Sequence, residues 1–217
     1  MKINIVLNKK LAKKIFIYFL TASLCAVYFM FMKGRISMPK IFLSPSLQEW
    51  NPYVDGGNEE YYMNLIADAM EPYLRASNIE FDRNSPEQTL TQAIEQSNKG
   101  NYDLHFAIHS NAAPENLAGK LSGADFYFYP TSSKGKEAAT VISENYKKIY
   151  PNPSNVEIIP TTTLAEVKRT KAPAVLAEVA YHDNPTQAQW IRDNINEIGK
   201  NLAEGIALYL GVPFVEP

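Results

Sequence analysis

Residues that can do chemistry stand at the ends of apolar stretches in this sequence. His109 closes the apolar run FAI and is followed by Ser110 and Asn111. Glu178 interrupts the apolar stretch PAVLAEVAY, where an ionised carboxylate is costly to bury without a partner. Glu60 follows the glycine loop VDGG and opens a helix. Alone, His109 could be a polar strand end, but with the two carboxylates it favours a metal site or an acid–base site.

The neighbouring acid and the two other histidines have simpler interpretations. Glu59 complements the helix dipole in the first turn, which leaves Glu60 free for other work. His105 lies in the middle of the apolar run YDLHFAI and is predicted to be a structural residue. His182 lies just beyond Glu178, in AYHDNP, where that strand is expected to end.

Strand-like and helix-like segments alternate from Lys40 onward. Apolar runs predict strands at 40–43, 79–83, 102–108, 124–130, 156–160 and 172–181. Helical periodicity and capping residues predict helices at 59–76, 85–97, 134–150, 186–192 and 194–210. This alternation predicts an α/β fold, a three-layer domain around a mostly parallel central sheet. In such sheets the chemistry lies at the carboxyl ends of the strands, where His109 and Glu178 fall.

The charge is distributed unevenly along the chain. Residues 1–39 carry seven Lys or Arg and no acid, so residues 40–217 hold 14 basic and 23 acidic residues, a net charge of −9. A domain this acidic is a poor binder of nucleic acid, because that affinity depends on neutralising phosphates. The single cysteine, Cys25, lies outside the domain, which therefore has no disulfide of its own.

The basic N-terminus predicts a membrane anchor. A cytoplasmic basic tail, 1–14, precedes an uncharged apolar run, 15–32, and a linker, 33–39. Eighteen helical residues span about 27 Å, enough to cross a bilayer core. The excess of lysines before the run predicts a single-pass protein of the cell membrane with residues 40–217 outside the cytoplasm. A cleaved signal peptide is the alternative.

Four stretches in the right order carry a resemblance to a known family. IFLSPSLQ stands where that family has a strand ending in Asp-Pro-Gly-His, EEYYMNLIA where its helix begins with Glu and continues to Asn-Leu, AIHSNA where it has Ser-Ile-His-x-Asn-Ala, and PAVLAE where it has Pro-Ala-Val-Leu-x-Glu. Over nearly all of residues 40–215, the sequence resembles the zinc-dependent N-acetylmuramoyl-L-alanine amidases of bacterial cell walls (amidase 3 type). The resemblance implies a catalytic domain at 40–217 with zinc ligands Glu60 and His109, the family's asparagine at Asn64, the catalytic carboxylate Glu178, and Asn111 orienting the loop or the substrate.

One position departs from the family pattern. Leu47 stands where the family has its first zinc-binding histidine, and leucine cannot bind a metal. Gln48 beside it can offer a carbonyl oxygen, a weaker zinc ligand than imidazole, and is expected to be the third ligand. His182 is the other candidate, reaching the site from a different strand end or supporting it from outside.

The resemblance implies hydrolysis of the amide bond between N-acetylmuramic acid and L-alanine in peptidoglycan. Zinc is the implied cofactor, polarising the amide carbonyl and activating water, while Glu178 passes the proton of water to the leaving amine. The alternative is a catalytically degenerate amidase-fold module that binds peptidoglycan or a partner protein without cleavage. The missing histidine supports that alternative, and the retention of Glu60, His109 and Glu178 opposes it. A different exported metal hydrolase acting on peptides is a third, weaker alternative.

Overall fold

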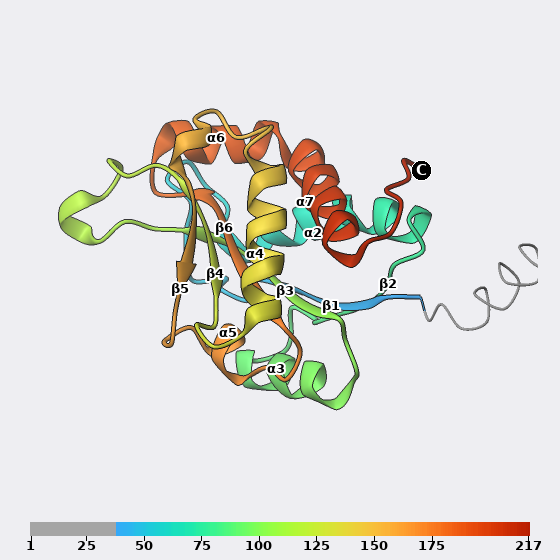
Figure 1. Cartoon of the computed structure of the whole chain (residues 1–217). Helices are drawn as coiled ribbons and strands as arrows, with labels where there is room; N and C mark the ends of the chain where they lie inside the picture. The colour runs from blue at the N-terminus through green and yellow to red at the C-terminus, as the bar shows by residue number, and fades with distance from the viewer. Residues whose placement is uncertain (1–37) are drawn as a thin grey trace, which may run out of the picture. The chain divides into compact units, whose positions relative to one another are not determined.

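The computed structural model describes residues 38–217, which form a six-stranded sheet with helices on both faces (Figure 1). The strands are β1 Lys40–Pro45, β2 Glu80–Arg83, β3 Leu104–Asn111, β4 Ala124–Phe128, β5 Val156–Pro160 and β6 Ala174–Tyr181. Their spatial order is β2-β1-β3-β6-β4-β5. Every neighbouring pair is parallel except β4 and β6. The predicted α/β fold around a mostly parallel sheet is confirmed.

Within residues 38–217, six α-helices surround this sheet. They are α2 Glu59–Ala76, α3 Leu90–Lys99, α4 Ser133–Tyr146, α5 Ala165–Arg169, α6 Pro185–Asp193 and α7 Ile195–Leu210. Short 3₁₀ turns lie at Glu115–Leu117 and Pro153–Asn155. Helices α2, α4 and α7 cover one face of the sheet, with α7 packed against both α2 and α4, while α3 and α5 lie on the other face (Figure 1).

The main core lies between the sheet and helices α2, α4 and α7. Alternate strand residues such as Leu43 and Phe106 face this core, as the period of two in a strand requires. Gly199 on α7 allows the two long helices to approach closely, because a Cβ there would stand 2.6 Å from the Cβ of Ala69 on α2.

The opposite face of the sheet is less apolar. Its small core consists of Ala107, Val167 and Leu176, packed beneath α5. His105 and His109 alternate with the core residues of β3 and therefore share this second face. The site is consequently built on the side covered by the short helices α3 and α5.

Two parts of the predicted secondary structure need correction. The helix predicted from Ser85 begins later, because Thr89 is the N-cap and forms the capping box with Gln92. Gln88 instead closes a turn, its side chain accepting a hydrogen bond from the backbone N–H of Ser85. Helix α5 lies between 160 and 172, where the sequence predicts neither a strand nor a helix.

The predicted tail, the predicted transmembrane segment at 15–32 and most of the linker lie outside the described residues. From Met38 to Pro217, no helix combines the length and the apolar character needed to cross a membrane.

Candidate active site

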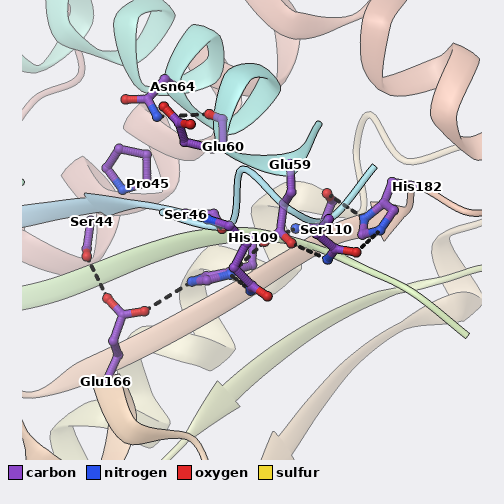
Figure 2. A network of polar contacts seen from close by, with 12 residues as sticks. Ser44, Pro45, Ser46, Glu59, Glu60, Asn64, His109, Ser110, Glu166 and His182 are labelled. Atoms are coloured by element: carbon purple, nitrogen blue, oxygen red, sulfur yellow. Dashed lines mark hydrogen bonds and ion pairs between the residues drawn. The ribbon is translucent and has the colours of Figure 1, made fainter. Parts of the chain in front are cut away.

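His109 lies between two carboxylates that come from different elements. Its Nδ1 lies 2.7 Å from Oε1 of Glu59, at the start of α2, and its Nε2 lies 3.0 Å from Oε2 of Glu166, on α5 (Figure 2). All three residues are buried. Burial acts to lower the pKa of His109, but the hydrogen bonds with Glu166 and Glu59 outweigh it and hold that pKa well above its ordinary value. His109 therefore bridges two buried carboxylates.

The acid that reaches His109 is Glu59, whereas the sequence analysis assigned Glu60. Glu59 shares the buried face of α2 with Met63 and Ile66, which lie four and seven positions further along the helix. Glu60 is only half-buried, and Figure 2 shows it beside Asn64, whose side chain donates to the carbonyl of Glu60. The assignment of Glu60 is therefore corrected, because one residue along a helix turns a side chain by about 100°.

A chain of hydrogen bonds holds Glu59 from behind. Asn51 Nδ2 donates to Glu59 Oε2 at 2.7 Å, and His182 Nε2 donates to Asn51 Oδ1 at 3.2 Å. His182 Nδ1 lies 3.0 Å from Ser110 Oγ, which also accepts from the hydroxyl of Tyr53 at 2.8 Å. Burial lowers the pKa of His182, which favours the neutral ring that this series of hydrogen bonds requires. His182 thus supports Glu59 through Asn51 and has no direct contact with His109.

Gln48 is the side chain that approaches His109 next to Glu59. Its Nε2 lies 3.4 Å from His109 Nδ1, so Gln48 and Glu59 meet on the same side of the ring. Leu47 lines the same cavity of about 440 Å³, together with His109 and Glu178. The position of the family's first histidine therefore faces the site but carries no donor.

Glu178 on β6 lies beside His109 on β3, since the two residues are partners in the parallel register of these strands. Its Oε2 is shielded from solvent and has no hydrogen-bond partner among the described residues. Burial raises the pKa of Glu178 to about 8; His109 lowers it, and the nearby charges of Glu59 and Asp125 raise it further. This carboxyl group can take up or release a proton near neutral pH.

Among the described residues, the side chain of Asn111 forms no hydrogen bond with His109 or Glu178. Its Nδ2 donates to Oδ2 of Asp125 at 3.3 Å, on strand β4, which lies on the far side of β6 from β3. Asp125 is the β4 partner of Glu178 in the sheet, and burial raises its pKa. Asn111 is therefore connected to the site only indirectly, through Asp125, the strand partner of Glu178.

The donor set can be compared with the needs of a zinc ion. Among residues 38–217, no group of three or more His, Cys, Asp or Glu side chains is arranged to hold a metal. Glu59 and His109 supply two strong donors, and Gln48 reaches the same side of the ring. If the terminal amide of Gln48 is turned by about 180°, its oxygen replaces its nitrogen at this place and can serve as a third donor. With these three and the unpartnered Oε2 of Glu178 nearby, the residues fit an open zinc site whose third ligand is weak.

Comparison with known proteins agrees with this fold. The family model described as N-acetylmuramoyl-L-alanine amidase matches residues 47–208, about three quarters of the chain. The chain belongs to this family, whose members hydrolyse the bond between N-acetylmuramic acid and L-alanine. A search of proteins with curated functions found no match.

Solved structures of amidases share the fold at low sequence identity. The catalytic domain of CwlV from Bacillus (Paenibacillus) polymyxa var. colistinus superposes with a TM-score of 0.69 at 18% identity, covering 81% of this chain and 100% of that one. Ami1 from Mycobacterium smegmatis gives 0.68 at 14% identity, with coverage of 82% and 99%. The CwlD amidase from Clostridioides difficile, in complex with the GerS lipoprotein, gives 0.68 at 18% identity, with coverage of 80% and 98%.

Sequence reasoning missed two carboxylates of the site. Glu59 could have been found, because Met63, Ile66 and Met70 continue its helical face. Glu166 gave no comparable signal, since α5 has only five residues and no side-chain cap.

Proposed function

We propose that the chain is an active amidase that uses zinc to cleave peptidoglycan between N-acetylmuramic acid and L-alanine. The observation that carries this proposal is Glu178. It is a carboxyl group with a pKa of about 8 and an unpartnered oxygen, placed beside His109 at the carboxyl end of the sheet. A buried acid with a shifted pKa in a cavity is typical of a proton carrier.

Each residue then has a separate task. Glu59 and His109 would hold the zinc ion, with the Gln48 oxygen as third ligand, and the ion would supply a Lewis acid for the carbonyl of the scissile amide. Glu178 accepts the proton of the attacking water and passes it to the leaving amine. Asn51 and His182 keep Glu59 in place through their hydrogen bonds. The apolar walls formed by Leu47, Leu90 and Leu176 suit the methyl groups of the lactyl ether and of L-alanine.

The test compares the unmodified chain with Glu178→Gln on purified peptidoglycan. The measurement is the release of new L-alanine amino termini. We expect zinc content and folding to be nearly unchanged in the variant, and turnover to fall by a factor on the order of 10² to 10⁴, the usual contribution of a positioned general base. Equal turnover in both proteins would exclude Glu178 as the proton carrier.

A second candidate function is peptidoglycan or protein binding without cleavage. Two observations favour it: Leu47 offers no donor, and both ring nitrogens of His109 already contact carboxylates. Zinc-supplied, unmodified chain that sediments with cell walls but releases no L-alanine termini would support this candidate over the enzyme.

We also propose that residues 15–32 anchor the protein in the cell membrane, with the amidase domain outside the cytoplasm. The support is the sequence alone: an uncharged apolar run preceded by five lysines. This placement would bring the domain to peptidoglycan, the substrate of its family.

A further inference from the structure

Glu166 occupies the side of His109 that faces away from Glu59. Its carboxylate is buried, with 4% of the residue exposed, and it accepts hydrogen bonds from three side chains. Oε1 accepts from Ser44 Oγ at 2.5 Å and from His105 Nε2 at 3.2 Å, while Oε2 accepts from His109 Nε2 at 3.0 Å. Figure 2 shows Glu166 between Ser44 and His109. These contacts tie α5 to β1 and β3.

The partners of Glu166 are themselves fixed. His105 is fully buried, its ring stacks on Phe42 with centroids 5.4 Å apart, and its Nδ1 lies 2.9 Å from Ser97 Oγ. The two ring nitrogens of His105 thus meet Glu166 on one side and Ser97 on the other. Every polar atom around the carboxylate is thus paired. Burial acts to raise the pKa of Glu166, but the bonds from His105 and His109 outweigh it and lower that pKa.

We propose that Glu166 is a positioning residue for the metal ligand His109. By accepting the Nε2 proton, it fixes the ring so that Nδ1 faces Glu59 and Gln48. Histidine ligands of metals commonly donate their second nitrogen to a carboxylate in this way, which fixes the tautomer and strengthens the ligand. The inference rests on the proposed zinc function and extends it, because it assigns a role to Glu166, Ser44 and His105.

A purely structural role explains this arrangement less well. A buried carboxylate costs free energy even when paired, and an apolar side chain at position 166 would pack with Val167 and Leu176 without that cost. The carboxylate contacts the one histidine whose opposite nitrogen meets Glu59 and Gln48. The charge therefore lies where it acts on the ligand.

The first test measures zinc affinity in the full-length chain. Glu166→Gln keeps the size of the side chain and can still accept one hydrogen bond, but it lacks the negative charge. We expect the zinc dissociation constant to rise by about 10- to 100-fold, the usual effect of losing such a partner. The matched control is Glu49→Gln, which removes one negative charge from an exposed position in the loop that follows β1. Its affinity should equal that of the unmodified chain.

The second test does not depend on a variant that folds. Long-range proton–nitrogen NMR correlations on histidine-labelled, zinc-loaded protein identify the ring nitrogen that binds metal. We expect zinc on Nδ1 of His109 and a slowly exchanging proton on Nε2. Zinc on Nε2, or a Glu166→Gln variant with unchanged zinc affinity, would overturn the proposal.

The NMR measurement also separates this inference from the proposed function. If the unmodified chain binds no zinc, the zinc function fails, and the metal-free spectrum still reports on the ring. A protected Nε2 proton that exchanges faster in Glu166→Gln supports ring fixation by Glu166. A proton that exchanges equally fast in both proteins refutes it.

Discussion

Oε1 of Glu59 lies 2.7 Å from Nδ1 of His109, although 50 positions separate the two residues in the sequence. The contact joins the first turn of α2 to the carboxyl end of β3. It exists because Glu59 continues the buried face of α2 and Asn51 holds its second oxygen. This pair decides which of two adjacent acids serves the site.

The pair predicts a difference between two neighbouring variants. Glu59→Gln should lose most of its zinc, because the amide is a weaker donor and the charge that balances the metal is gone. Glu60→Gln should keep its zinc, since its side chain lies beside Asn64. The measurement is metal content by elemental analysis after dialysis without chelator. The opposite ranking would restore the assignment from the sequence motif.

The sequence predicted the frame of the site because its signals are local. The helix from 59 to 76 has the predicted bounds, since Asn58 caps it and glycines precede it. The strands carrying His109 and Glu178 were recognisable as apolar runs that end in polar residues. Parallel strands bring such ends together, so the two residues could be placed at one edge without a structure.

The remaining contacts depend on packing that the sequence does not show. The sequence assigned Glu60 because it stands at the position of the family's glutamate and because Glu59 suited the helix dipole. The structure instead buries the face of α2 that carries Glu59, Met63 and Ala67. The pairing of Glu166 with His105 joins residues 61 positions apart through a helix of one turn, so no local periodicity reports it.

Leu47 provides a gain-of-function prediction. Its side chain lines the cavity with His109 and Glu178, at the position of the family's first histidine. Leu47→His should therefore add an imidazole donor and lower the zinc dissociation constant at least about tenfold, which corresponds to roughly 1.4 kcal/mol. Competition with a metal indicator measures the change. Leu47→Phe is the control with a ring but no donor, and an equal affinity in both variants would show that position 47 does not reach the metal.

The apolar run at 15–32 predicts the behaviour of the protein in cell fractionation. The full-length chain should stay with the membrane pellet after washing with high salt and be released by detergent, because apolar insertion does not depend on ionic strength. Immunoblotting of the fractions measures this. A shortened chain in the medium that begins after residue 32 would instead establish cleavage.

Glu178 predicts how the stability of the metal-free protein depends on pH. Its folded-state pKa of about 8 lies above the ordinary value of 4.5, so the folded state holds this proton more tightly than the unfolded state. The stabilisation from protonated Glu178 is fully present below about pH 4.5 and is lost as pH rises through about 8. Glu178→Gln cannot lose a proton, so relative to the unmodified chain it should gain roughly 3 to 5 kcal/mol between these limits. Urea unfolding at several pH values, with chelator present, measures the difference. The control Glu157→Gln removes an exposed acid from β5, and its free energy of unfolding should change with pH as that of the unmodified chain does. If the free energy of Glu178→Gln also follows the unmodified chain at every pH, the carboxyl group of Glu178 is ionised in the folded protein at no cost.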